Sequence, residues 1–131
     1  MSRRSSIVYA SQLEAYRTVE KTTMSGRELE ASVLAKAALM LKECQDNWEG
    51  PDHAARLQKA LRNNQMVWTI FESELAREDN PLPKQLRLDI LRLGGFVDKR
   101  IFEVMANPSP EKLTMIININ LNLAAGLRGA P

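Results

Sequence analysis

The chain has 131 residues, of which 44% are hydrophobic and 26% are charged. This balance is typical of a folded globular protein and excludes a largely disordered one. The formal net charge of +2, from 18 basic and 16 acidic residues, is too small for the extended positive field of nucleic-acid-binding proteins. We therefore expect a single domain over residues 1–131, with residues 1–8 flexible.

Cysteine usage and hydropathy indicate the compartment. Cys44 is the single cysteine, which excludes an intramolecular disulfide and fits a reducing environment. Arg3 and Arg4 are not followed by the apolar stretch of a secretory signal. No run approaches the roughly 20 apolar residues of a membrane span. We expect a cytoplasmic protein without membrane insertion.

Prolines and glycines divide the chain at three places: residues 50–51, 80–83 and 107–110. Between these breaks, apolar residues recur every three or four positions, which is typical of helices. The first helix is predicted over residues 7–22, where Tyr9, Leu13 and Tyr16 share a face. A second helix is predicted to begin at a capping box formed by Ser25 and Glu28.

The third predicted helix follows Pro51 and ends before residues 80–81. Trp68 and Phe71 lie on its apolar face and are expected in the core. Asn64 lies on the same face and has two interpretations. A buried asparagine can fix the register of packed helices at some cost in stability. The favoured interpretation places Asn64 at the edge of the face, in contact with water.

The fourth predicted helix begins near Pro83 and is apolar on nearly all sides. Such a helix is typical of a central position or of contact with a partner. Its main apolar face is accompanied by apolar residues elsewhere on the helix: Leu88, Leu91, Phe102 and Met105. Gly94 and Gly95 interrupt the segment. They indicate a kink, a break into two helices, or a place where another backbone comes close.

The last element contains the letters "LTMIININLNLAAGL", which fit both strand and helix periodicity. The residues Ser109-Pro110-Glu111 ahead of it form a helix start, with a serine cap and a first-turn proline. We therefore predict a helix, with an apolar face made of Leu113, Ile116, Ile119, Leu123 and Leu127. The expected fold is all-α, a single-domain bundle of about five helices.

No constellation of catalytic residues is present in the sequence. The single histidine, His53, is expected at the surface or near a helix cap. Cys44 falls on an apolar face and is expected to be packed rather than nucleophilic. The sequence "LRLGGFVDK" lacks the spacing and the Lys-Ser/Thr of a phosphate-binding loop. We expect no enzyme activity, no cofactor and no metal site.

Apolar residues away from the main helix faces mark a candidate partner surface. The predicted partner-binding residues are Met66, Ile70, Leu88, Phe102, Met115 and Leu121.

Three stretches resemble the flagellar biosynthesis regulator FlaF family of bacteria, in order and in spacing. They are "AYRTVEKTTMSGRELEASVLAKAALML", "ALRNNQMVWTIFESELAREDNPLPKQLRLDILRLGGFVDKR" and "ININLNLAAGLR". The resemblance covers roughly residues 14–128, nearly the whole chain. The central stretch is the most specific. Its motif residues are Asn64, Trp68, Phe71, Glu74, Leu75, Asn80, Leu82, Pro83, Arg87, Gly94, Phe96, Val97 and Asp98.

The resemblance implies a small cytoplasmic factor for flagellum assembly that binds flagellin as an export chaperone and thereby regulates flagellin synthesis and secretion. It also implies a connection with the regulator FlbT. The alternative is a post-transcriptional regulator acting on flagellin messenger RNA or through FlbT. RNA binding is disfavoured, because acidic residues interrupt the loose basic cluster formed by Arg87, Arg92, Lys99 and Arg100.

Overall fold

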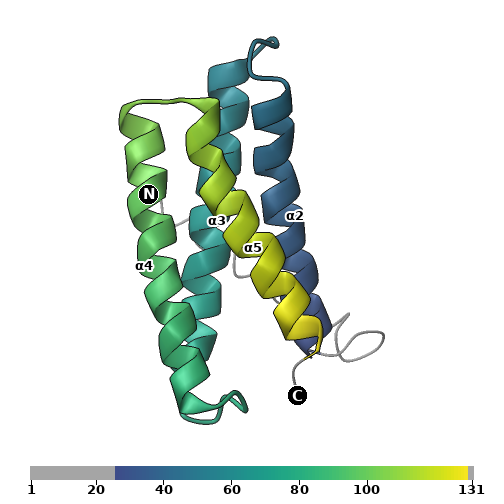
Figure 1. Ribbon diagram of the computed structural model, residues 1–131, viewed down its shortest axis with the longest axis vertical. Coiled ribbons are helices and arrows are strands. Elements are labelled where there is room, and N and C mark those ends of the chain that lie inside the picture. Colours follow the sequence, from purple (N-terminus) through teal and green to yellow (C-terminus); the bar gives the residue numbers. More distant parts are fainter. Residues whose placement is uncertain (1–25, 130–131) are drawn as a thin grey trace, which may run out of the picture.

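The computed structural model describes residues 26–129, which form four α-helices and one short 3₁₀ helix (Figure 1). The elements in chain order are α2 (Gly26–Asp46), α3 (His53–Leu75), α4 (Lys84–Ala106), η1 (Pro110–Lys112) and α5 (Leu113–Arg128). The all-α prediction is confirmed, and residues 113–128 are helical as predicted. The helix predicted over residues 7–22, the Ser25 cap and the flexibility of residues 1–8 lie outside the described residues.

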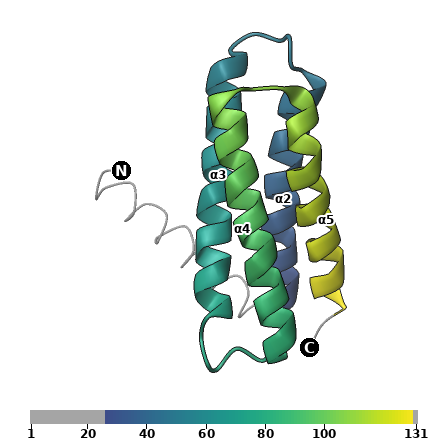
Figure 2. The same cartoon turned by 60° about the vertical axis from the view of Figure 1, so that its left-hand side comes forward.

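The four helices run alternately up and down around a shared core (Figure 1). In Figure 2, α4 lies in front, between α3 and α5, with α2 behind. The closest pair is α2 with α5, whereas α4 touches its two neighbours much less. Helix α2 buries Ala31, Ala37 and Ala38, and small side chains let neighbouring helices approach closely. Three helices thus form a tight unit, and α4 completes the ring.

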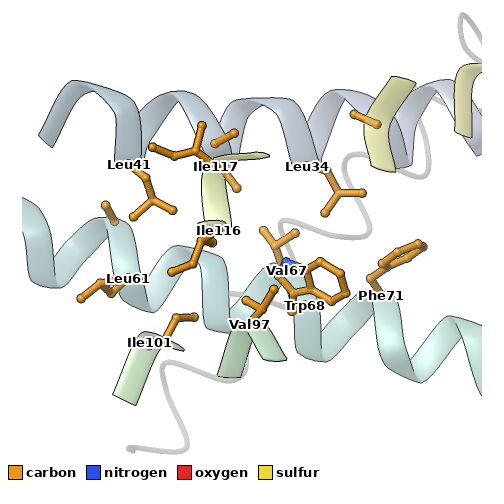
Figure 3. Close-up of a cluster of buried hydrophobic side chains, with 14 of the residues drawn as sticks. Leu34, Leu41, Leu61, Val67, Trp68, Phe71, Val97, Ile101, Ile116 and Ile117 are labelled. Carbon is orange, nitrogen blue, oxygen red and sulfur yellow. The ribbon is translucent and has the colours of Figure 1, made fainter. Parts of the chain in front are cut away.

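The core receives large side chains from all four helices (Figure 3). Trp68 of α3 lies near its centre and is fully buried. The Phe71 ring packs edge-on against Trp68, with 5.9 Å between ring centroids. Both aromatic residues are therefore core residues, as predicted.

A chain of hydrogen bonds between side chains crosses the core. Trp68 Nε1 donates to Asn120 Oδ1 at 2.9 Å, and Asn120 Nδ2 donates to Asn64 Oδ1 at 2.7 Å. Asn64 Nδ2 donates in turn to the carbonyl oxygens of Ala37 and Ala60, at 3.1 and 2.9 Å. All three side chains are fully buried. This polar core network joins α2, α3 and α5, and it fixes their register because each group needs its partner.

The network corrects two predictions. Asn64 is buried and does not touch water, so the favoured interpretation of this residue was wrong. The inward face of α5 also differs from the predicted one. Asn120 and Ala124 are fully buried, whereas Ile119 and Leu123 are only partly buried. An asparagine replaces an apolar residue at the centre because Trp68 and Asn64 satisfy its amide.

Helix α4 runs without interruption through Gly94 and Gly95. A Cβ atom on Gly94 would lie 2.8 Å from Glu72 Oε1 and 3.2 Å from Trp68 Cε3, whereas one on Gly95 would meet nothing within 4 Å. The predicted break into two helices is therefore wrong. The predicted close approach is found at Gly94, although the neighbours are side chains of α3 and not a backbone.

The turn between α3 and α4 is closed by Asn80 and Arg87. Asn80 Oδ1 accepts from the Leu82 amide, and Asn80 Nδ2 donates to the Glu74 carbonyl, both at 3.0 Å. The Arg87 guanidinium donates to the carbonyl oxygens of Leu75, Arg77 and Leu82. The bonds to the Glu74 and Leu75 carbonyls satisfy groups at the end of α3, where helical partners run out, and those to Arg77 and Leu82 hold the turn.

The start of α5 differs from the prediction in detail. Ser109 precedes the 3₁₀ helix, but its hydroxyl donates to the Glu111 carboxylate at 3.0 Å and not to a backbone group. The predicted serine cap is therefore absent. Pro110 begins η1, and α5 follows from Leu113.

Replacing Asn120 with alanine is expected to lower the free energy of unfolding by about 2–4 kcal/mol. The indole N–H of Trp68 and the side-chain oxygen of Asn64 would lose their hydrogen-bond partner in the core. Asn118, two residues away, is exposed, so Asn118→Ala should change stability by less than about 0.5 kcal/mol. Urea unfolding of both variants measures the difference. Equal effects would contradict a structural role for the network.

The two glycines should respond in opposite directions to the same substitution. Gly94→Leu is expected to lower the free energy of unfolding by about 1–3 kcal/mol, because the side chain meets Glu72 and Trp68. Gly95→Leu enters open space and should raise it by up to about 1 kcal/mol through helix propensity. Thermal unfolding followed by circular dichroism compares the pair. A stable Gly94→Leu variant would show that α3 and α4 do not pack this closely.

Candidate functional site

Exposed apolar side chains gather on α4. Within residues 26–129, seven large apolar side chains are exposed, and five of them belong to this helix. The α4 members are Leu86, Leu88, Phe96, Phe102 and Met105. The exposed fraction of Phe102 is 64%, the highest of the seven. Exposed apolar area concentrated on one helix is typical of a site that binds another protein.

Three of these five residues, Leu88, Phe102 and Met105, lie on a stripe of α4 that runs beside its buried stripe. The buried stripe of α4 consists of Ile90, Gly94, Val97, Ile101 and Val104, at alternating intervals of four and three. A parallel stripe follows at intervals of three and four: Leu88, Leu91, Gly95, Asp98, Phe102 and Met105. We name this second stripe the outer seam. Alternation of three and four is the spacing with which one helix packs along another.

Two carboxylates mark the outer seam halfway along its length. Asp98 belongs to the seam, and Glu72 approaches it from α3. Burial raises the pKa of the Asp98 carboxyl, and burial together with the charge of Asp98 raises the pKa of the Glu72 carboxyl. Neither carboxylate forms a hydrogen bond or an ion pair with any residue between 26 and 129. The seam therefore combines apolar side chains with negative charge that a cationic partner would neutralise.

A pocket of about 650 Å³ lies at the far end of the outer seam. Met105 lines it from α4, and the rings of Trp48 and His53 pack there at a tilt of 55°, with 4.0 Å between centroids. His53 is the first residue of α3 and is half-buried, which fits the prediction that it lies near a helix start. The pocket extends the apolar surface beyond the last turn of α4.

The structure brings together only part of the predicted partner-binding set. Leu88 and Phe102 lie on the outer seam and are exposed. Met66 and Ile70 are half-buried on a face of α3 that points away from the core network.

The two predicted residues of α5 lie apart from each other. Met115 is half-buried, and Leu121 is exposed on another side of the helix. Leu121 follows Thr114 by two turns, and Thr114 accepts a hydrogen bond from Gln45 of α2 at 2.9 Å. Leu121 thus lies on the side of α5 that Thr114 shares, and it is not part of the outer seam of α4. Leu91 and Met105 belong to the seam but were not in the predicted set. Their spacing from Leu88 and Phe102 was the signal that could have identified them.

The loose basic cluster is partly used by the fold. Arg87 closes the α3–α4 turn. Arg100 pairs with Glu103 at 3.3 Å and donates to the Lys112 carbonyl at 3.4 Å. Arg92 and Lys99 then remain as exposed cations on α4, which is a small surface for binding a nucleic-acid backbone.

Cys44 is 3% exposed, and burial raises the pKa of its thiol. This confirms that it is packed, as predicted. In the described part of the chain, no three side chains of histidine, cysteine, aspartate or glutamate gather closely enough to hold a metal ion.

Most residues of the family motif have a structural role. Asn64 and Trp68 belong to the core network. Asn80 and Arg87 close the turn after α3. Gly94 allows close contact between α4 and α3. The purely apolar motif residues Phe71, Leu75, Leu82 and Val97 are buried in the core. Glu74 accepts the Asn80 hydrogen bond through its carbonyl, and Pro83 immediately precedes α4. Phe96 and Asp98 are the motif residues that fold geometry does not explain, and both lie on α4.

The family model described as flagellar protein FlaF matches residues 12–127. The chain belongs to the FlaF family. The match covers nearly all of the four described helices and begins inside the helix predicted over residues 7–22. No curated protein and no solved structure matches the chain. No FlaF helix between residues 26 and 129 has the length and apolar character needed to cross a membrane.

Proposed function

We propose that this FlaF protein binds flagellin in the cytoplasm as an export chaperone, and that it regulates flagellin synthesis and secretion through this binding. The observation that carries the proposal is the outer seam of α4. Membership of the FlaF family supports a role in the flagellum, and the seam supplies a surface with which a helical protein could be bound.

The seam fits an amphipathic helix as its ligand. Some helices of flagellin pack against their neighbours only in the assembled filament. The apolar faces of these helices must be covered by another protein before export. An apolar groove on a helical bundle binds such a helix through the apolar residues of the helix, which are spaced by three and four. Leu88, Leu91, Phe102 and Met105 offer this spacing along several turns of α4. A basic residue of the client opposite Asp98 would neutralise the charge within the seam.

The opposite flank of α4 makes a suitable comparison. Phe96 is 55% exposed there, close to the exposure of Phe102. Of its neighbours one turn away, Leu93 is partly buried against the core, and Arg92, Lys99 and Arg100 are basic. No exposed apolar stripe therefore continues from Phe96. The proposal therefore places the client helix on the seam side. The client would contact the other predicted residues only if it extends beyond α4; these are Met66, Ile70, Met115 and Leu121.

Phe102→Asp is expected to weaken flagellin binding by at least about 30-fold, because a buried aromatic contact becomes a desolvated charge. Phe96→Asp places the same substitution on the same helix and should change the dissociation constant by less than about threefold. Isothermal titration with flagellin of the same bacterium measures both variants. Circular dichroism verifies that the two variants retain equal helicity.

Salt dependence separates flagellin binding from RNA binding. An apolar seam should hold flagellin on a sizing column at both low and high salt, whereas affinity for RNA falls steeply as salt rises. Absence of a shared peak at either salt would overturn direct flagellin binding, and FlbT would become the partner to test. Loss of binding in Phe96→Asp alone would place the client between α4 and α5.

A further inference from the structure

We propose that the outer seam, together with the side of α3 next to it, selects its ligand by the spacing of charges. The ligand that fits is a helix with a basic residue and, about three turns away on the same face, an acidic residue. The inference rests on the proposed function for the identity of the ligand as flagellin, and it adds which kind of helix the seam accepts. Three features support it: two carboxylates in the middle of the seam, an arginine at its pocket end, and the distance between them.

Glu72 of α3 and Asp98 of α4 form one negative site in the middle of the seam. A Cβ atom built on Gly94 would lie 2.8 Å from Glu72 Oε1, so the Glu72 carboxylate lies against α4 one turn before Asp98. Burial, and then the charge of Asp98, raise the pKa of the Glu72 carboxyl, as expected of two neighbouring negative charges. No basic side chain lies three or four positions from either residue on its own helix. The site therefore favours a ligand that supplies a cation.

The pocket at the far end of the seam has the opposite charge. Arg62 of α3 lines this pocket beside Met105, the last residue of the seam. Its guanidinium forms no hydrogen bond or ion pair with any residue between 26 and 129. Lys59, one turn earlier on α3, is also basic and exposed, and no acidic side chain lies three or four positions from Arg62. An acidic residue of the ligand would thus be stabilised at this end.

The separation of the two sites sets the spacing of charges in the ligand. Glu72 follows Arg62 by ten residues on α3, which corresponds to about 15 Å along the helix axis. A ligand helix that lies along the seam covers this distance with about ten or eleven residues, or roughly three turns. Both charges would then lie on the same face of the ligand, beside the apolar residues that contact Leu88, Leu91 and Phe102.

The same charges disfavour a second copy of the chain as the ligand. The intervals of the outer seam are symmetric about a centre between Gly95 and Asp98. Two copies related by a two-fold axis would therefore pack their seams antiparallel around this centre. The Glu72 and Asp98 carboxylates of both copies would meet there, and like charges repel one another. A ligand with a cation at this position avoids the repulsion.

Designed helical peptides, titrated with the full chain, test the charge selection. All peptides share one apolar stripe with residues spaced by three and four. The first carries a lysine and a glutamate eleven positions apart beside the stripe, and the second carries them seven positions apart, which keeps both on the same face. In fluorescence anisotropy at low salt, the first peptide should bind at least about fivefold more tightly than the second.

Substitutions in the full chain assign this preference to the two sites. Asp98→Asn and Arg62→Gln should each reduce the preference to less than about twofold, because the one remaining charge contact is open to both peptides. Arg92→Gln is the matched control, since Arg92 is exposed on α4 outside the seam and the pocket, and it should leave the preference unchanged. Circular dichroism verifies that the three variants are equally helical.

Four results would overturn the charge selection. They are failure of the first peptide to bind, equal affinity of the two peptides, a preference that survives Asp98→Asn or Arg62→Gln, and a preference that disappears in Arg92→Gln. Flagellin of the same bacterium is titrated in the same assay. If flagellin does not bind while the peptide preference is intact, the proposed function is wrong and the charge selection stands. If flagellin binds and the peptides are not distinguished, only the charge selection is wrong.

Discussion

The arrangement of the bundle depends on the hydrogen bonds that join Trp68, Asn120 and Asn64 in the core. Each of these buried groups would be costly if its partner moved by one turn, so the network selects a single register for α2, α3 and α5. Apolar packing alone would tolerate several registers of such helices, because leucine and isoleucine faces interchange readily. The network therefore gives the bundle one defined surface, and α4 is placed against it.

Helix α4 differs from the other three in what it presents to solvent. Its buried stripe contains a glycine at the point of closest contact with α3, and its outer seam remains largely uncovered by residues 26–129. Core packing accounts for the first stripe but provides no reason for Phe102 or Leu88 to be apolar. A helix of a binding partner packed along α4 would supply that reason.

Periodicity and punctuation predicted the helical class and the existence of the four described helices, because apolar spacing and proline positions are local properties. Asn120 could not be placed in this way. Its burial depends on Trp68 and Asn64, which are more than 50 residues distant in sequence. The choice between Gly94 and Gly95 likewise required knowledge of which glycine faces α3. The predicted partner-binding set holds only two of the four apolar side chains of the outer seam, Leu88 and Phe102. Leu91 and Met105 are absent from it, although their intervals of three from Leu88 and Phe102 are visible in the sequence.

The three carbonyl contacts of Arg87 have a consequence for the kinetics of recognition. They anchor the first turn of α4 to the end of α3, so this end of the helix is restrained before any partner arrives. A surface that is preformed in this way loses little conformational entropy on association. The rate of complex formation would then be set by diffusion, and opening of the bundle would not be a required step.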